Sequence, residues 1–175
     1  MYTLHPMKKI VLFLSLIIAA GCTQAQTPAT TATPNIDKIP PFHILTKDSV
    51  YLTPANLKKG KPVMIIYFAP DCSHCQRLMY EMQPHMSEFK DIQIVMITFT
   101  QTSLLKMLSE FYKDYNFQKY PNIMMGTEYP NYVVQRYYQV ANTPFIAIYD
   151  HKGKLVQTFP KAPKMPELIA AVKKS

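Results

Sequence analysis

The sequence predicts an α/β fold in which a mixed central sheet carries helices on both faces. Apolar runs of strand length alternate with segments whose apolar residues recur every three or four positions, the spacing of an amphipathic helix. Near the end, two strand-like runs follow each other directly and a last helix closes the chain. The alternation favours parallel strands, and the final pair adds antiparallel ones. With 175 residues, 48% of them hydrophobic, the chain has room for one such domain.

The first elements read as a hairpin, a helical turn and a buried strand. Residues 42–45 (FHIL) and 49–52 (SVYL) flank a polar turn, which predicts a β-hairpin, and residues 54–57 fit one helical turn. Residues 63–68 (VMIIYF) are continuously apolar, as expected of a strand that is buried on both faces.

The later elements follow from apolar spacing and from turn residues. Leu78, Met82 and Phe89 lie at helical spacing, so a helix should begin near the cysteines and run to about Phe89, with a kink at Pro84. The elements expected after it are a strand at 92–99, a helix at 103–115, a short strand at 120–125, a helix at 131–138, strands at 145–149 and 155–159 joined by a tight turn, and a helix at 166–174.

The most informative motif is Cys72-Ser73-His74-Cys75, at the expected start of the first long helix. Free backbone N–H groups and the positive dipole end of the helix favour a thiolate at Cys72, and the thiolate is the nucleophilic form. Cys75 lies one turn later, close enough to form a disulfide, so the pair can take up or release two electrons. A charged imidazole at His74 would stabilise the thiolate further, whereas the Asp71 carboxylate would disfavour it.

Metal binding is the weaker interpretation of these residues. Zinc needs a second pair of ligands, and the sequence has no further Cys pair or closely spaced His pair. Met79, Met82, His85 and Met86 could form a soft copper site on one helix, but methionines at helical spacing more often fill a core. We therefore expect no metal and no organic cofactor, because the redox-active disulfide Cys72–Cys75 is itself the reactive group. An inert pair of buried thiols is the other alternative.

These features together resemble the thioredoxin-fold family. YFAPDCSHC follows a buried strand and opens a helix, Thr143-Pro144 precedes the strand FIAIY at the place of the family's cis-proline loop, and DHKGKLV matches its closing hairpin. The first hairpin, LKKGKPVMIIYF and the long segment between Cys75 and Pro144 are similar to the TlpA-like branch of extracytoplasmic thiol–disulfide oxidoreductases. The resemblance covers about residues 42–174.

The resemblance implies a role for each matching residue. Cys72 would be the exposed nucleophile and Cys75 the buried resolving thiol. Pro144 would follow a cis peptide bond beside the sulfurs, so that the backbone of Thr143 pairs with a substrate strand, and Ser73 is expected to bind substrate with them. The implied partners are protein dithiols and disulfides. The resemblance favours a reductant that is recharged by a membrane thiol donor, whereas His74 is the main argument for an oxidant.

The chain departs from the family pattern near the cysteines. Asp71 stands where a tryptophan often precedes the first cysteine, and Ile66 stands where thioredoxins bury an acidic residue. Glu81 is left as a candidate to take the proton from Cys75, although a solvated helix face is the more common place for such a residue. Ala69 stands where a peroxidase needs Thr or Ser, so a peroxiredoxin-like protein is a lesser alternative, as is a thioredoxin-fold lipoprotein that binds copper or a partner.

The N-terminal residues predict export and lipid attachment. Residues 1–21 combine Lys8 and Lys9 with an apolar stretch and a small-residue end, which is typical of a signal peptide. Cys22 follows directly and resembles the lipidated cysteine of bacterial lipoproteins. We expect residues 22–38 to form the lipid anchor and a flexible tether, and residues 39–175 to form a thioredoxin-like domain. This places the protein on the extracytoplasmic, periplasm-facing side of the bacterial cell envelope, attached to the membrane through its lipid.

Charge and aromatic content say little about further partners. The formal net charge of +8 falls to +6 without Lys8 and Lys9, and the other lysines are scattered, so we expect no nucleic-acid partner. Residues 111–138 are rich in tyrosine and phenylalanine. We expect most of these side chains to pack the segment onto the sheet, with a partner-docking surface as the alternative.

Overall fold

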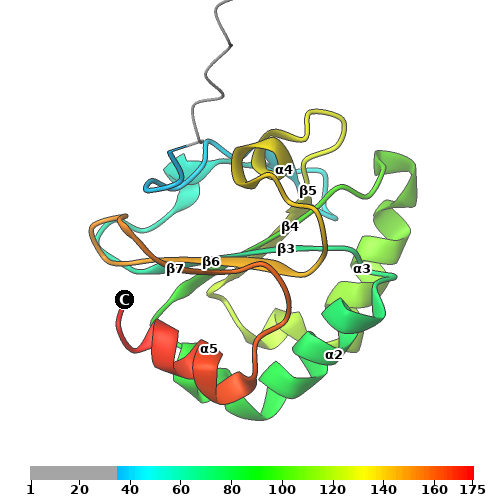
Figure 1. Ribbon diagram of the computed structural model, residues 1–175. Helices are drawn as coiled ribbons and strands as arrows, with labels where there is room; N and C mark the ends of the chain where they lie inside the picture. Colours follow the sequence, from blue (N-terminus) through cyan, green and yellow to red (C-terminus); the bar gives the residue numbers. More distant parts are fainter. Residues whose placement is uncertain (1–34) are drawn as a thin grey trace, which may run out of the picture. The chain divides into compact units, whose positions relative to one another are not determined.

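The computed structural model describes residues 35–175 (Figure 1). The predicted signal peptide, Cys22 and all but the last residues of the predicted tether lie outside the described residues. Within residues 35–175, every helix is too short or too polar to cross a membrane.

The ordered contacts of the domain begin before position 39, where we placed its boundary. The hydroxyl of Tyr137 donates to the backbone carbonyls of Asn35 and Lys38 at 2.9 and 2.6 Å. The hydroxyl of Tyr149 donates to the carbonyl of Ile36 at 3.1 Å. Residues 35–38, assigned to the tether from their composition, therefore contact the domain through their backbone.

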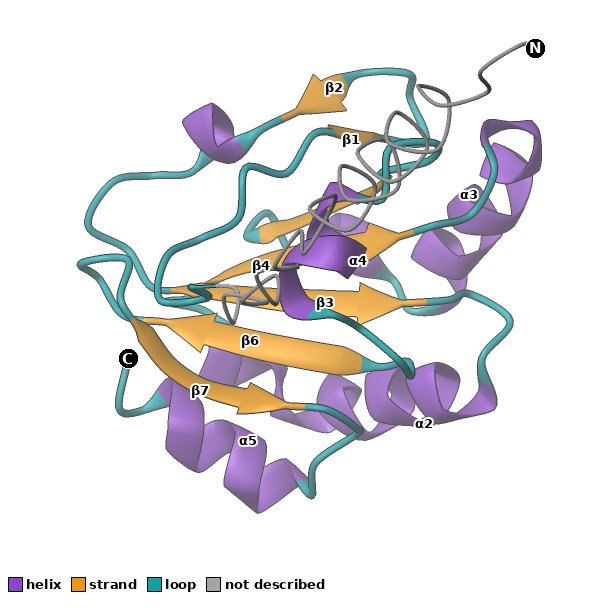
Figure 2. Ribbon diagram, turned by 45° about the horizontal axis from the view of Figure 1, so that its top comes forward, coloured by secondary structure: helices purple, strands orange, loops and turns teal. Residues whose placement is uncertain are grey.

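Seven strands form one mixed sheet in the order β2-β1-β5-β4-β3-β6-β7 (Figure 2). Their bounds are β1 Ile44–Leu45, β2 Tyr51–Leu52, β3 Val63–Phe68, β4 Gln93–Thr98, β5 Ile123–Thr127, β6 Phe145–Tyr149 and β7 Leu155–Phe159. Strands β3, β4 and β5 are parallel, whereas β6 pairs antiparallel with β3 and β1 pairs antiparallel with β5. Every residue of β3 and β4 is buried, as the unbroken apolar run of residues 63–68 predicts for β3, and the burial of β4 includes the polar residues Gln93 and Thr98.

Helices cover both faces of this sheet (Figure 1). Helices α2 (Ser73–Met82), α3 (Leu105–Asp114) and α5 (Met165–Val172) lie on one face, and α4 (Val133–Tyr138) lies on the other. Alternate side chains of β3 enter the two cores, because successive residues of a strand point to opposite faces. Ile66 and Phe68 pack under α2, whereas Ile65 and Tyr67 pack under α4. The predicted fold class is confirmed.

The observed bounds of some elements differ from the predicted ones, at loops and at Pro84. The helix after the cysteines is α-helical only to Met82 and continues as a 3-10 helix over Gln83–Phe89. Pro84 lies in its first turn, where it has no N–H to donate to a preceding carbonyl. The hairpin strands are two residues long each, shorter than predicted. Further 3-10 turns span Pro54–Asn56, Thr102–Leu104 and Phe117–Lys119.

Candidate active site

Cys72 lies in the turn that joins β3 to α2, at the N-cap of the helix. Its N–H donates to the carbonyl of Ala69 at 3.2 Å, which closes the turn after the strand. Its extended backbone (φ −81°, ψ 115°) directs the sulfur back over the first helical turn, where Sγ accepts the N–H of Cys75 at 3.4 Å. The side chain of Gln76 donates to the carbonyl of Pro70 at 2.8 Å and so fixes the turn to the helix. The sulfur thus occupies the position of a capping side chain.

The surroundings of Cys72 favour its thiolate form. Partial burial by itself would raise the pKa of this thiol, but hydrogen bonds with Cys75 and Thr143 and with the backbone N–H groups of Cys75 and His74 outweigh it. The pKa of Cys72 therefore lies below its ordinary value. Since the side chain is also partly exposed, Cys72 combines the accessibility and the ionisation that a nucleophile needs.

Cys75 has the opposite character. Its side chain is completely buried in the core beneath α2. Burial, and after it the hydrogen bond from its side chain to Cys72, raise the pKa of its thiol to about 12. One thiol of the pair is thus accessible and easily ionised, and the other is enclosed and protonated, as the resemblance implies for a nucleophile and a resolving thiol.

The loop before β6 brings Thr143 and Pro144 to the sulfur. The Thr143–Pro144 peptide bond is cis, as the resemblance implies. The carbonyl oxygen of Thr143 lies 3.5 Å from Cys72 Sγ and accepts a hydrogen bond from the thiol. Antiparallel pairing of β6 with β3 accounts for this meeting, because Phe145 pairs with Tyr67 at the end of β3 where Cys72 follows. Four predicted site residues therefore come together.

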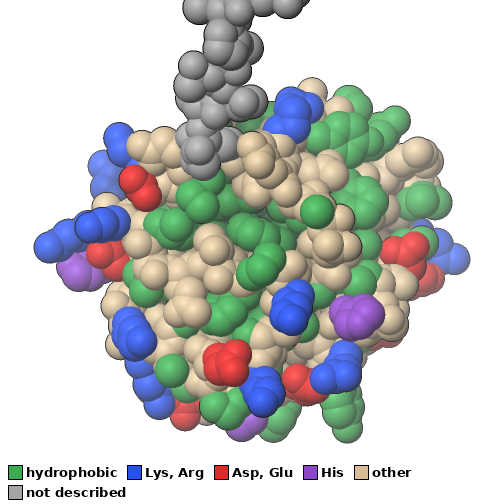
Figure 3. Space-filling view, viewed as in Figure 1, with side chains coloured by type: hydrophobic (Ala, Val, Ile, Leu, Met, Phe, Trp, Pro, Cys, Tyr) green, Lys and Arg blue, Asp and Glu red, His purple; other side chains and the backbone are tan. Residues whose placement is uncertain are grey.

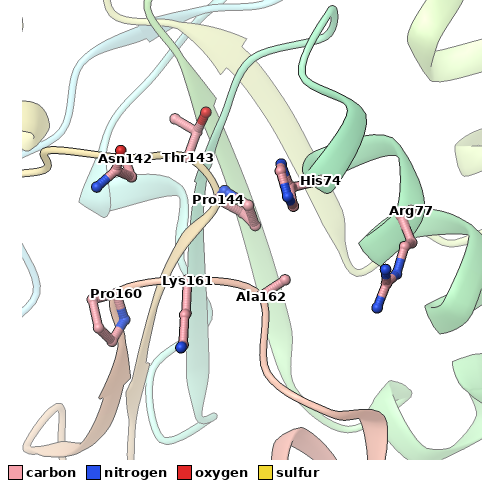
Figure 4. Close-up of a pocket in the computed structure, with 8 residues that line it drawn as sticks. All are labelled: His74, Arg77, Asn142, Thr143, Pro144, Pro160, Lys161 and Ala162. Atoms are coloured by element: carbon pink, nitrogen blue, oxygen red, sulfur yellow. The ribbon is translucent and has the colours of Figure 1, made fainter.

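A groove of about 650 Å³ opens beside these residues (Figure 4). Its walls are the first turns of α2, the loop before β6 and the segment between β7 and α5. The residues that line it are His74, Arg77, Asn142, Thr143, Pro144, Pro160, Lys161 and Ala162. The imidazole of His74 points toward Pro144, and the residue acts on the pKa of Cys72 through its backbone N–H. Ser73 is exposed at the first position of α2 and is not among the lining residues.

The weaker expectations near the cysteines have different outcomes. Glu81 accepts a hydrogen bond from Arg77 Nε at 2.9 Å on the helix surface, as expected of a solvated face. No carboxylate of the described residues is among the groups that shift the pKa of Cys75. The three methionines of the copper hypothesis lie in the core, whereas His85 is exposed. Residues 35–175 contain no cluster of three His, Cys, Asp or Glu side chains arranged for a metal ion.

One buried charge near the site was missed by sequence reasoning. Glu128 is 1% exposed and follows β5 directly. Its carboxylate accepts the hydroxyl of Tyr67 at 2.8 Å and the N–H groups of Val134 and Gln135 at 2.7 and 3.1 Å. It therefore fixes the start of α4, whose end leads into the loop that carries Thr143. No motif marks a lone glutamate between a strand and a turn, so the sequence offered no signal for it.

Most aromatic residues of the segment 111–138 pack inward. Phe111 and Phe117 are buried in the core beneath α3, and the ring of Tyr115 packs against both. The hydroxyl of Tyr115 donates to the carbonyl of Gln76 at 3.2 Å, which connects α3 to the active-site helix. This packing supports the interpretation that the segment is held on the sheet by its aromatic side chains.

Comparison of the sequence with known protein families identifies the family of this chain. The model of the thioredoxin-like domain family matches residues 55–174. The chain belongs to this family. The family prediction made from the sequence is thereby confirmed. The search of curated proteins gave no significant match.

Solved structures share the thioredoxin-like fold at low sequence identity. A secreted disulfide oxidoreductase of Mycobacterium tuberculosis, homologous to E. coli DsbE, is 19% identical over 77% of this chain and 96% of its own, with a TM-score of 0.63. An exposed lipoprotein thioredoxin of Streptococcus pneumoniae is 21% identical over 77% and 98%, with a TM-score of 0.57. A peroxiredoxin-like protein of Aquifex aeolicus is 17% identical over 79% and 85%, with a TM-score of 0.62. At these identities the likeness shows the fold.

Proposed function

We propose that this thioredoxin-like protein is a thiol–disulfide oxidoreductase that reacts through Cys72 and Cys75. The observation that carries the proposal is the position of Cys72 Sγ at the N-cap of α2. There it accepts the N–H of Cys75 at 3.4 Å and has a lowered pKa, while the second thiol is buried one turn away. This arrangement provides one nucleophile and one resolving group, which is what disulfide exchange requires.

The reaction proceeds in two exchanges. The Cys72 thiolate attacks one sulfur of a substrate disulfide, forms a mixed disulfide and releases the other substrate sulfur as a thiolate that takes up a proton. Cys75 then loses its proton and attacks Cys72 Sγ, which forms the Cys72–Cys75 disulfide and releases the second substrate thiol. Two electrons pass from the protein dithiol to the substrate. The peptide backbone at Thr143 and Pro144 supports the substrate beside the sulfur, and the reaction needs no metal or organic cofactor.

The proposal also includes the direction of electron transfer, the attachment of the protein to the membrane and the donor that reduces it again. The protein acts as a reductant of protein disulfides outside the cytoplasm, attached to the membrane through a lipid on Cys22, and a membrane thiol donor returns it to the dithiol form. The sequence resemblance to the TlpA-like branch supports this direction. The names of the secreted oxidoreductase and of the lipoprotein thioredoxin among its structural neighbours support the location.

Insulin reduction tests the proposed reaction. We expect Cys72→Ser to abolish the reduction of insulin by the reduced protein, because Cys75, the other cysteine of residues 35–175, is completely buried. Ser87→Ala, at an exposed position of the 3-10 helix after α2, is the control and keeps the activity. Activity of Cys72→Ser equal to that of the wild type would refute the proposal.

A redox titration tests the direction. The protein is equilibrated with defined mixtures of reduced and oxidised glutathione, and free thiols are counted by alkylation and mass spectrometry. A potential near that of thioredoxin, roughly −270 mV, is expected of a reductant, whereas a value near about −120 mV would assign it to the oxidants. A protein that forms no Cys72–Cys75 disulfide at any ratio is not an oxidoreductase of this kind.

A further inference from the structure

Two grooves of opposite charge flank Cys72. The groove of about 650 Å³ described above contains the cations Arg77 and Lys161 and no carboxylate among its lining residues. A second groove of about 430 Å³ lies between the active-site turn and α3. Its lining residues include the carboxylates Asp71, Glu110 and Asp114 and no cation.

Helix geometry places the two grooves on opposite sides of the active-site helix. We call the groove with Arg77 and Lys161 the basic groove and the groove with Asp71, Glu110 and Asp114 the acidic groove. His74 lines the basic groove and Gln76 lines the acidic groove. Residues two positions apart on an α-helix point to nearly opposite sides, because each residue turns the helix by about 100°. Glu110 and Asp114 are four apart on α3 and therefore share one face of that helix.

Both grooves reach the nucleophile. Thr143 lines the basic groove, and its carbonyl oxygen is 3.5 Å from Cys72 Sγ. Asp71 lines the acidic groove and precedes Cys72 in the chain. A peptide whose disulfide sulfur reaches Cys72 therefore extends toward cations in one direction and toward carboxylates in the other.

The charges in the grooves are available to such a peptide. Within residues 35–175, Lys161 and Asp114 form no ion pair within 4.0 Å. Arg77 is paired with Glu81 through Nε at 2.9 Å, and Glu110 lies 3.8 Å from Lys106. Both of these pairs are on the surface, where such pairs are weak and water competes with them.

We propose that the substrates of this oxidoreductase carry opposite charges on the two sides of the reacting cysteine. Acidic side chains on one side contact Arg77 and Lys161, and basic side chains on the other side contact Glu110 and Asp114. This inference rests on the proposed function and adds a substrate class to it. Selectivity then comes from the order of charges along the peptide and does not depend on its net charge.

Two peptides with the same composition test this polarity. They are acetyl-Glu-Glu-Gly-Cys-Gly-Lys-Lys-amide and acetyl-Lys-Lys-Gly-Cys-Gly-Glu-Glu-amide, each as a mixed disulfide with 2-mercaptoethanol. Both have zero net charge, so long-range attraction to the protein is the same. We expect the reduced protein to react with one of them about tenfold faster in kcat/KM at low salt, the combined effect of several surface charge pairs. The ratio should approach one at high salt, because the Debye length shrinks to about 3 Å at 1 M.

Charge-neutralising variants connect the ratio to the grooves. Two double variants should each lower the ratio: Arg77→Gln with Lys161→Gln, and Glu110→Gln with Asp114→Asn. The variant with all four substitutions, called the fourfold variant, should bring the ratio to one. Lys152→Gln with Lys154→Gln is the control. These two lysines lie in the β6–β7 turn, at the end of the sheet opposite Cys72. Their substitution changes the net charge by as much as Arg77→Gln with Lys161→Gln does, and we expect it to keep the wild-type ratio.

The outcomes separate this inference from the proposed function. If the wild-type protein reduces neither peptide, the proposed function fails. If it reduces both at equal rates at low salt, the oxidoreductase function holds and the polarity inference is wrong. A ratio that survives in the fourfold variant also overturns the inference, because the selectivity then comes from other residues.

Discussion

At the scale of single residues, the site depends on the different environments of two similar thiols. Cys72 lies on the helix end, partly exposed, with donors directed at its sulfur, whereas Cys75 lies in the core with its pKa raised to about 12. Because the thiolate is the reactive form, this difference fixes the order of events. In the proposed reaction, the outer sulfur meets the substrate first, and the inner sulfur reacts with the outer one.

Alkylation of the reduced protein should reveal this difference directly. We expect iodoacetamide to modify Cys72 with a pH midpoint below that of an ordinary thiol, since its pKa is lowered, and to leave Cys75 unmodified through the same range. Peptide mass spectrometry after timed quenching at each pH measures both rates. Equal rates at the two cysteines would contradict the assignment.

Removing the resolving thiol should trap the intermediate. In Cys75→Ser, the mixed disulfide between Cys72 and a substrate has no internal thiol to release it, so a stable covalent adduct should accumulate. Non-reducing electrophoresis with a disulfide-containing peptide detects it, and dithiothreitol should remove it. Cys72→Ser is the matched control and should form no such adduct, because Cys75 is completely buried. Adduct formation by that control would show that the roles are reversed.

At the scale of elements, the active site is assembled from segments that a buried carboxylate holds in place. Glu128 connects β3, through Tyr67, to the first turn of α4, and α4 leads into the loop that carries Thr143. Burial raises the pKa of Tyr67, and the nearby Glu128 carboxylate raises it further, so the phenol stays protonated as a donor. Glu128 is therefore a positioning residue for the substrate loop.

Glu128→Gln should weaken both the fold and substrate binding. The amide replaces one acceptor oxygen by a donor that faces backbone N–H groups, a loss of about 1–3 kcal/mol in the free energy of unfolding. Urea unfolding measures this loss. A rise in KM for a peptide disulfide with kcat little changed would show that the loop is displaced, which a loss of stability alone does not produce. Glu88→Gln, at an exposed ion pair with Lys173, is the control and should cost less than about 1 kcal/mol. Equal effects of the two variants would contradict the role given to Glu128.

The elements that could be predicted from the sequence are those in which the pattern of apolar residues reflects which faces are buried. Residues 63–68 are apolar without interruption because both faces of β3 are covered, and Cys72 could be placed at a helix start because that strand ends just before it. The hairpin strands were predicted too long, since Phe42 is buried without being paired and Val50 is exposed beside the turn. The roles of Glu128 and Lys161 could not be predicted, because Tyr67 is 61 residues from Glu128 and the groove of Lys161 is completed by residues of α2 and of the loop before β6.

At the scale of the whole molecule, buried tyrosines on the α4 side of the sheet connect stability to alkaline pH. Burial raises the pKa of Tyr67, Tyr138 and Tyr149. Hydrogen bonds raise the pKa of Tyr67 and Tyr138 further, whereas the bond with Tyr138 partly offsets the rise at Tyr149. Unfolding exposes these phenols to water, where they ionise near pH 10. The folded protein keeps their protons to higher pH, so its stability is complete below about pH 10 and falls as the pH rises beyond it.

Urea unfolding of the disulfide form between pH 8 and 11 tests this dependence without contributions from free thiols. Above pH 10, each buried tyrosine should lower the free energy of unfolding by up to about 1.4 kcal/mol per pH unit. Tyr138→Phe should make the decline less steep, whereas Tyr80→Phe, at a side chain that is 72% exposed, should not change it. The same slope in wild type and Tyr138→Phe would show that this phenol ionises without opposing the fold.

Charge is distributed differently over the face shown in Figure 3 and in the two grooves beside Cys72. On the face shown in Figure 3, cationic and anionic side chains are interspersed, and they form no continuous basic stripe. Beside Cys72, in contrast, the two signs are sorted into separate grooves. In the proposed reaction, this sorting would let the order of charges beside the reacting cysteine determine which segment is reduced.

The backbone contacts of residues 35–38 fix where the chain enters the domain. The carbonyl of Asp37 accepts the N–H of Leu155 at 3.1 Å, and Ile36 is held by Tyr149, so the chain enters the domain where β6 ends and β7 begins. Cys72 follows the other end of the sheet, about 20 Å away along the six-residue strand β3. Whatever precedes residue 35 therefore joins the domain at the end of the sheet away from Cys72, and its point of attachment leaves the two grooves beside the sulfur open.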